Sequence, residues 1–195
     1  VDVYFLQAQS QDVTVGFAEP RSAAVAGDLA RIGGVITTEP MRVVPAKIRF
    51  GPREERENLQ GVPSTQELHH VFDAMGRSIR LPADGLVIST MLADMLGATV
   101  GDVLTVQVLE GRRPLLQVPV VELFETYIGS PAYIDIKALN RLMKEQSSVS
   151  AVHLRLDSDR SRRDAANADL RCERSGEHAR KHCLRRLRGA MGRER

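Results

Sequence analysis

The sequence predicts an α+β fold, and three observations lead to that class. Residues 11–17 alternate apolar and polar side chains, which is the pattern of a half-buried strand. Residues 19–35 repeat apolar side chains at helical spacing and end in a pair of glycines. Between Gly85 and Leu123 the chain carries in turn the patterns of a strand, a short helix and a β-hairpin. With 43% hydrophobic residues in a chain of 195, such elements can bury a core.

The first three elements predict a β-α-β unit. The strand at 11–17 places its two valines on one face. Pro20 stands in the expected first turn of the helix, where a missing N–H group is tolerated. Residues 35–51 predict a second strand, and its prolines, Pro40 and Pro45, favour an edge position or a bend.

A charged stretch follows at residues 52–63. Its glutamates are interleaved with Arg53 and Arg56, which is typical of a solvated loop rather than of a catalytic acid–base pair. Within this stretch, 58–62 has the composition of a short strand.

Residues 64–76 predict an amphipathic helix. Ser64 or Thr65 can serve as its N-cap, and Glu67 stands three positions after Ser64, as in a capping box. Apolar side chains recur at helical spacing, and they define the expected buried stripe: Leu68, Val71, Phe72 and Met75.

The run from Gly85 to Leu123 is the best patterned part of the chain. Residues 86–88 predict a buried strand, and Ser89 or Thr90 can cap the short helix that follows. Gly97 supplies the left-handed position at the end of this helix. The helical side chains expected to point inward are Leu92, Met95 and Leu96.

A hairpin and two further elements complete the predicted body. Leu104, Val106 and Val108 face one way, and residues 110–114 reverse the chain into a second strand at 115–124. After the hairpin, Asp135 caps a helix at 136–145, and 150–156 alternates as a final strand. We expect the folded body to end at about Leu156.

The histidines and serines form no catalytic or metal-binding pattern. His69 and His70 would point about 100° apart on a helix, and no cysteine or carboxylate cluster accompanies them. His153 alternates with apolar neighbours, which is typical of a solvent-facing or hydrogen-bonded strand residue. No serine has the G-x-S-x-G pattern, and the glycines form no phosphate loop. We therefore predict no catalytic residue, no cofactor and no bound metal.

The turn of the hairpin is the candidate contact site, with Glu110, Gly111, Arg112 and Arg113. Two arginines on an exposed tight turn suit a partner protein, an anionic ligand or a lipid headgroup. Charged hairpin tips are also common as plain soluble turns, and the sequence leaves both interpretations open.

The ordered set of these elements resembles a transporter family. Residues 85–143 are similar to the extracytoplasmic core domain of FtsX-like and MacB-like ABC transporter permeases, in which a strand and a short helix lead into L-G-x-x-x-G-D-x-[VL]. Residues 11–49, with the run GV…EP.R.VP…R, resemble the stretch just outside the first membrane helix of that family. The resemblance covers about residues 4–156.

The resemblance implies a permease with four membrane helices and a large extracytoplasmic domain between the first two. The present chain holds no run of roughly 18 apolar residues, so we expect it to be that domain alone. A MacB-like domain would have two lobes. A membrane-proximal β-α-β lobe would comprise 1–51 and 131–156, and an inserted β-rich lobe would comprise 52–130.

The same resemblance implies a mechanical and non-catalytic function. The domain would relay ATPase-driven motion to cargo or to an envelope partner, from the periplasmic side of the cell inner membrane. The implied partners are a cytoplasmic ATPase subunit, a second permease subunit and a periplasmic or envelope protein, without nucleic acid.

Two other classes of function stay open at this point. A cleft between the lobes suits a small-ligand binding module or an enzyme, which a ligand-dependent rise in melting temperature would reveal. Nucleic-acid binding rests only on a basic tail, because residues 157–195 carry 12 Lys and Arg against 7 Asp and Glu. Residues 1–156, by contrast, carry 15 Lys and Arg against 18 Asp and Glu.

That tail departs from the family pattern. Residues 157–195 contain no Val, Ile, Phe or Tyr and can add little to a core. They are either a disordered basic segment or, as we prefer, the product of a frameshift in GC-rich coding DNA. The cysteines and histidines of the tail match no common zinc-finger spacing: Cys172, His178, His182 and Cys183.

Overall fold

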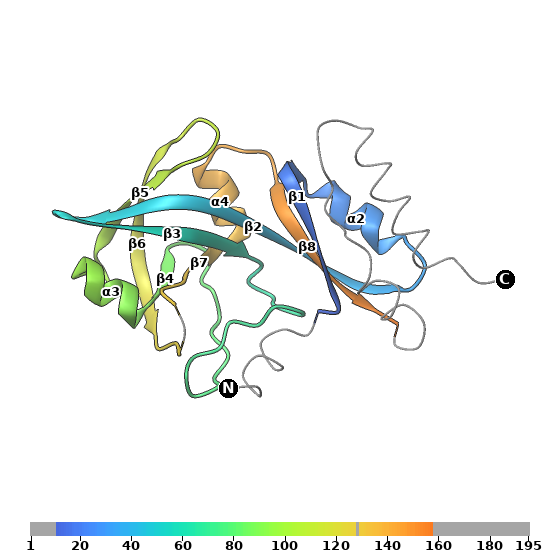
Figure 1. The fold of residues 1–195 in the computed structure, drawn as a ribbon, viewed down its shortest axis with the longest axis horizontal. Coiled ribbons are helices and arrows are strands. Elements are labelled where there is room, and N and C mark those ends of the chain that lie inside the picture. The colour runs from blue at the N-terminus through green and yellow to red at the C-terminus, as the bar shows by residue number, and fades with distance from the viewer. Residues whose placement is uncertain (1–10, 128, 158–195) are drawn as a thin grey trace. The chain divides into compact units, whose positions relative to one another are not determined.

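The computed structural model describes residues 11–127 and 129–157. Strands dominate the described chain and helices are few and short, so the α+β class is confirmed (Figure 1). The elements in chain order are β1 (Val13–Ser22), α2 (Ala24–Ala30), β2 (Val35–Phe50), β3 (Arg53–Val62), β4 (Leu86–Ser89), α3 (Thr90–Leu96), β5 (Val103–Val108), β6 (Leu115–Phe124), β7 (Ala132–Asp135), α4 (Ile136–Leu142) and β8 (Ser148–Leu156). The predicted basic tail and its cysteines lie outside the described residues.

The chain forms two compact units. Among the described residues, the first unit contains 11–41, 66–70 and 147–157, and the second contains 42–65, 71–127 and 129–146. Residues 42–51 and 131–146, which the sequence prediction assigned to the first lobe, lie in the second unit. The lobe boundaries themselves stay a prediction.

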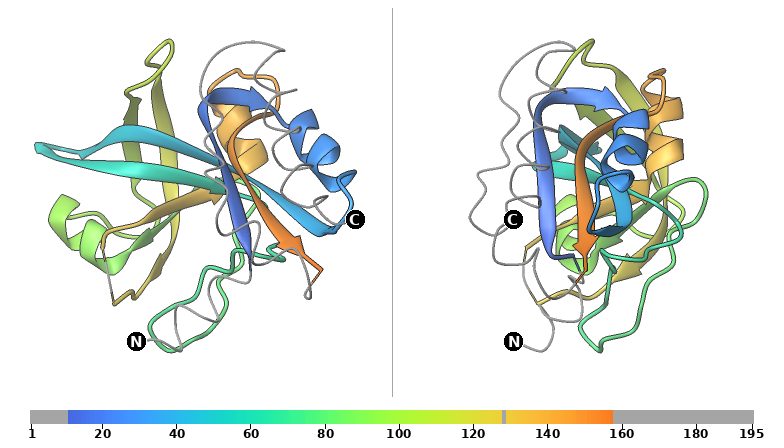
Figure 2. Two further views of the ribbon diagram at one scale, coloured as in Figure 1. Left: turned by 45° about the vertical axis from the view of Figure 1, so that its right-hand side comes forward. Right: turned by 90° about the vertical axis from the view of Figure 1, so that its right-hand side faces the viewer.

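The first unit is an antiparallel sheet with one helix beside it. Within the described chain, β8 lies between β1 and the first part of β2, so Val152 pairs with Val15 on one side and with Pro40 on the other. Helix α2 lies beside β8 in both views of Figure 2, with Val25 and Leu29 buried. These two side chains are among the buried apolar residues of the unit, together with Val13, Val15, Val152 and Leu154 of the strands.

The predicted start of the first helix is wrong. Strand β1 continues through Pro20, and Arg21 and Ser22 pair with β8 after a register irregularity. Because β1 is the edge of its sheet, the missing N–H group of a proline is tolerated there. The helix begins only at Ala24, whose N–H donates to the Ser22 hydroxyl over 3.4 Å.

Strand β2 is continuous over 16 residues and belongs to both units. Pro40 pairs with β8 alone among the named strands, and Pro45 pairs with β3 alone. The stretch from Ala46 to Arg49 is paired on both sides, with β3 and β5. The Pro45 carbonyl also accepts from the Leu109 N–H at 2.8 Å, just beyond β5, so the predicted edge position holds at Pro40 but not at Pro45 or beyond it.

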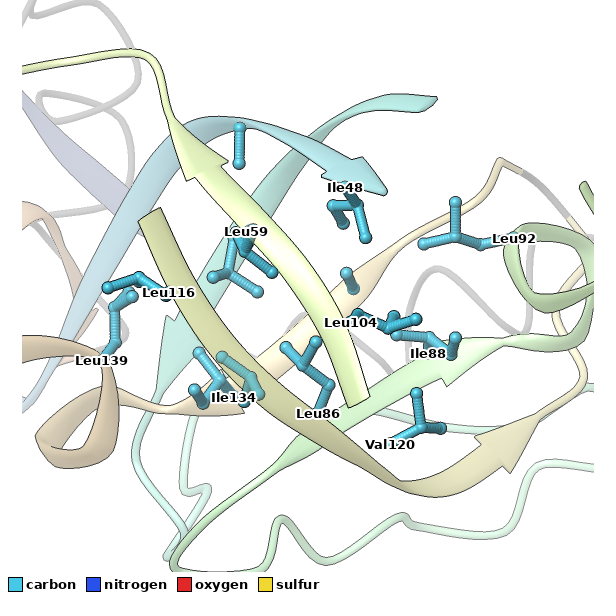
Figure 3. Packing of buried hydrophobic residues seen from close by; sticks show 14 of the residues in the cluster. Ile48, Leu59, Leu86, Ile88, Leu92, Leu104, Leu116, Val120, Ile134 and Leu139 are labelled. Carbon is cyan, nitrogen blue, oxygen red and sulfur yellow. The ribbon is translucent and has the colours of Figure 1, made fainter. Parts of the chain in front are cut away.

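The second unit is built around a closed ring of strands. In the described chain β2 pairs with β3, β3 with β7, β7 with β4, β4 with β6, β6 with β5, and β5 again with β2. Apolar side chains from these strands and from α3 and α4 form the core (Figure 3). Figure 3 shows Leu92 of α3 and Leu139 of α4 on opposite sides of the labelled cluster.

The predicted charged loop is a strand instead. Phe50 pairs with Arg53 across a two-residue turn, which Gly51 enters with φ +55°. Glu54 follows this turn directly. Its carboxylate accepts from Lys47 Nζ at 2.8 Å and from Arg49 Nε at 3.2 Å. These bonds to the two cations lower the pKa of Glu54 to about 2. Cross-strand pairing thus accounts for the alternating charges that suggested a loop.

The helix predicted at 64–76 does not form. Glu67, Leu68 and His69 instead donate their backbone N–H groups to the Glu39 carboxylate. Further along, Asp73 accepts N–H bonds from Met75 and Arg77 in a tight turn, and Met75 is exposed rather than buried. Side-chain oxygens that compete for backbone N–H groups in this way displace a helix.

The run from Gly85 to Leu123 follows its prediction closely. All four residues of β4 are buried, the Ser89 hydroxyl accepts from the Leu92 N–H at 3.2 Å, and Gly97 has φ +71°. Leu104, Val106 and Val108 of the hairpin all face the core. The exception is Met95, which is exposed while its helix buries Ala93. Asp135 caps α4 as predicted, by accepting from the Lys137 and Ala138 N–H groups.

Two adjacent leucines of β6 give a matched test of this core. Leu116 is 6% exposed and packs in the cluster, whereas Leu115 is 66% exposed. We expect Leu116→Ala to lower the free energy of unfolding by about 2–5 kcal/mol, and Leu115→Ala to change it by less than about 0.5 kcal/mol. Urea unfolding of the two variants checks this. Equal losses would contradict the difference in burial between the two leucines, and a larger loss for Leu115→Ala would show that β6 faces the other way.

Candidate functional site

The hairpin turn predicted as a contact site is exposed at its tip. It lies between β5 and β6, in the yellow-green loop of Figure 1. Gly111 and Arg113 both have positive φ, +55° and +50°, and the Arg113 N–H donates to the Glu110 carbonyl at 3.0 Å. The side chains of Arg112 and Arg113 are exposed. The turn therefore presents two guanidinium groups from a defined backbone.

Glu110 differs from its neighbours, because its carboxylate is bound from within the unit. It accepts from Arg42, whose side chain is 1% exposed. The same guanidinium lies 3.3 Å from the Glu145 carboxylate and donates to the Val43 carbonyl at 3.2 Å. Arg42 on β2 therefore joins the base of the hairpin to the end of α4. Sequence reasoning missed Arg42, although an arginine next to the apolar residues Met41, Val43 and Val44 was a signal for it.

A second polar cluster lies in the first unit, around Glu39. Glu39 is 4% exposed, and both of its carboxylate oxygens accept backbone N–H groups. One oxygen accepts from Glu67 at 2.6 Å and from Leu68 at 2.9 Å, and the other accepts from His69 at 3.1 Å. Three successive N–H groups thus converge on one buried carboxylate, which is the arrangement of an anion-binding backbone nest.

Two histidine rings lie beside this carboxylate. His153 is 5% exposed, so of its two predicted roles the hydrogen-bonded one is confirmed. Its Nδ1 lies 2.8 Å from the Thr14 hydroxyl, and its Nε2 lies 3.3 Å from the Met41 sulfur. The ring of His69 stacks on that of His153, with centroids 5.5 Å apart and planes at 14°. Both ring nitrogens of His69 are buried without a hydrogen-bond partner.

Burial dominates the electrostatics of the histidine pair. The pKa of His153 is lowered from 6.5 to about 4, mainly by burial and also by the neighbouring His69, while Glu39 opposes the shift. Burial likewise lowers the pKa of His69. Both rings are therefore mainly neutral at pH 7.

The cluster is suited to holding a backbone segment in place rather than to binding a metal. The Glu39 oxygens receive backbone N–H groups, and among the described residues no group of three or more His, Cys, Asp or Glu side chains could hold a metal ion. Sequence reasoning did not bring the members of this cluster together, because they come from β1, β2, β8 and the segment 66–70.

Comparisons with known proteins point to one type of domain. The chain matches the extracellular domain of the ABC-type transporter YknZ from Gram-positive bacteria, with a TM-score of 0.52 and 16% identity over 75% of this chain and 78% of that chain. It also matches the periplasmic region of MacB from Actinobacillus actinomycetemcomitans. The TM-score is 0.51 and the identity 10%, over 96% of this chain and 87% of that chain. The fold is that of extracytoplasmic domains of MacB-like ABC permeases. Neither a family profile nor a curated protein matches the sequence.

A third solved structure matches with a lower TM-score. It is a domain of a putative permease protein from Porphyromonas gingivalis, with a TM-score of 0.42 and 16% identity over 80% of this chain and 75% of that chain. Within the described ranges, the present chain has no helix long and apolar enough to span a membrane.

The buried ion-pair cluster predicts a non-additive effect on stability. We expect Glu110→Gln and Glu145→Gln each to cost about 0.5–1 kcal/mol, because both carboxylates are partly exposed. The double variant should cost more than the sum, since either carboxylate alone can still neutralise part of the Arg42 charge. Urea unfolding of the natural protein, the two single variants and the double variant measures the coupling energy between the two carboxylates. Glu122→Gln, on the exposed side of β6, is the matched control, and strict additivity would contradict the shared-partner arrangement.

Proposed function

We propose that this chain is the extracytoplasmic domain of an ABC transporter permease and that it relays ATPase-driven motion to cargo or to an envelope partner. The observation that carries the proposal is the fold shared with the extracellular domain of YknZ and the periplasmic region of MacB. These matches extend over most of both chains. A relay needs a body that moves without deforming, and a closed ring of strands around a packed apolar core has that property.

The proposal includes the assembly in which the domain would work. The full-length permease would lie in the cell inner membrane, paired with a second permease subunit and with a cytoplasmic ATPase subunit that hydrolyses ATP. The two lobes of the sequence prediction, 1–51 with 131–156 and 52–130, would then be the membrane-proximal and the inserted parts. The domain itself would be non-catalytic.

We assign the contact with a periplasmic or envelope partner to the hairpin tip. Arg112 and Arg113 are exposed there, and the backbone between β5 and β6 is held by hydrogen bonds within the turn. The bond between Glu110 and buried Arg42 anchors the base of the tip. An anchored tip loses less conformational entropy on binding than a free loop, which favours recognition at this site.

Cysteine labelling in intact cells tests the location of the domain. We expect Leu115→Cys, in a cysteine-free full-length permease, to react with a membrane-impermeant maleimide in intact cells, because this side chain is 66% exposed. Leu116→Cys is the control. Because this neighbouring side chain is buried, its thiol should not react while the domain is folded. Labelling of Leu115→Cys only after the cells are lysed would place the domain in the cytoplasm and overturn the proposal.

Charge reversal at the tip tests the partner contact. We expect Arg112→Glu to reduce transport by the full-length permease with its ATPase roughly three- to tenfold, since an exposed ion pair is worth up to about 1 kcal/mol and reversal adds repulsion. The melting temperature of the domain should not change. Arg80→Glu makes the same charge change at another exposed position and should leave transport unaltered. If Arg112→Glu and Arg80→Glu transported equally well, the hairpin tip would not be the site of the partner contact.

A further inference from the structure

We propose that Glu39, His69 and His153 form an acid-released latch, which holds residues 66–70 on the sheet of the first unit at neutral pH and releases them in acid. The latched segment has an unusual place in the chain. Residues 66–70 belong to the first compact unit, whereas the residues on both sides of them, 42–65 and 71–146, belong to the second. The contacts around Glu39 are what hold this short segment in the first unit.

The attachment consists of charge-assisted hydrogen bonds to the backbone. Three consecutive N–H groups, from Glu67 to His69, converge on the Glu39 carboxylate at 2.6–3.1 Å. Hydrogen bonds of this kind to an ionised and buried acceptor are stronger than those between neutral groups. Since the N–H groups belong to consecutive residues, the whole segment is held or released together.

The two imidazole rings connect this attachment to pH. The His153 ring is held in the buried site by two contacts: its Nδ1 lies 2.8 Å from the Thr14 hydroxyl, which can donate or accept, and its Nε2 lies 3.3 Å from the Met41 sulfur. The His69 ring, stacked at 5.5 Å, has no hydrogen-bond partner for either nitrogen. A proton on either ring therefore places a charge against the other ring in a buried site, which is unfavourable.

The surrounding charges come from three elements, and burial outweighs them. Strand β2 contributes Glu39, the segment contributes Glu67, His69 and His70, and Arg155 lies two positions from His153 on the same face of β8. Of these groups, Glu39 favours an imidazolium, whereas the histidines oppose it. Burial is the largest influence on the pKa of both rings, and it lowers both.

These shifts fix the direction of the pH dependence. The pKa of His153 is about 4 in the latched state, against 6.5 for an ordinary histidine. The released state therefore binds a proton at a higher pH than the latched state does. The contribution of His153 to the latch is complete above about pH 6.5 and is lost as the pH falls from there toward 4, by up to about tenfold per pH unit. His69, whose pKa is also lowered by burial, contributes in the same direction.

Hydrogen exchange of the full chain at pH 7 and pH 5 tests the latch. The quantity to compare is the protection factor, which corrects for the intrinsic pH dependence of exchange. We expect the protection of the Glu67, Leu68 and His69 amides to fall at least tenfold, while Val152 and Leu154 of β8 keep theirs. Unchanged protection at 67–69 would overturn the proposal. A parallel loss in β8 would also overturn it, because it would show unfolding of the unit instead of release.

Variants identify the groups that sense the pH. We expect the double variant His69→Phe/His153→Gln, which keeps an aromatic ring and a polar amide without titration, to show flat protection at 67–69 between pH 7 and 5. His70→Asn removes the histidine that has the smallest influence on the pKa of His69, so this comparison variant should keep most of the pH dependence of the natural chain. Glu39→Gln should lose protection at 67–69 already at pH 7. If protection at 67–69 in the double variant depended on pH as it does in the natural chain, the histidines would not be the groups that sense the pH. The measurement on the natural chain decides the proposal even where a variant fails to fold.

Discussion

The pairing of strand β2 is the constraint on which the rest of the structure depends. One continuous strand gives residues 35–41 to the sheet of the first unit and residues 42–50 to the ring of the second. Because side chains alternate along a strand, Glu39 faces the segment 66–70, whereas Arg42 lies on the opposite face with the side chains that enter the ring. A slip of one residue would turn both charges to the wrong faces, so each of them fixes the register.

Sequence signals predicted the fold well where all of the deciding contacts are local. The run from β4 through the β5–β6 hairpin carries its own cap, its own C-terminal glycine and its own alternation, and all three agree. The segment 64–76 had equally good local signals for a helix, but its N–H groups bind Glu39, a residue far away in the sequence. The charged strand β3 was missed for the same reason, since Glu54 is paired across the hairpin with Lys47.

The candidate sites show the same limit. The hairpin tip was found from the sequence because a turn with two arginines is exposed whatever surrounds it. Glu39 and Arg42 were not singled out, although a charged residue within an apolar strand is costly to bury and so calls for a partner. Sequence alone could mark these positions as unusual. It could not supply the partners, because His69 and His153 meet only when β8 pairs with β2 and the segment 66–70 reaches this sheet.

The two buried charges of β2 are satisfied in different ways, and this difference divides their roles. Arg42 binds two carboxylates that are partly exposed to solvent. Water and dissolved ions therefore screen the electrostatic attraction between the guanidinium and these carboxylates. Glu39 binds backbone N–H groups, which carry no net charge and do not titrate in this range. The strength of the Glu39 contacts therefore depends on the charge state of the site itself, which includes the two neighbouring imidazoles. It follows that Arg42 is suited to a permanent structural link, whereas Glu39 is suited to a link that the surroundings can weaken.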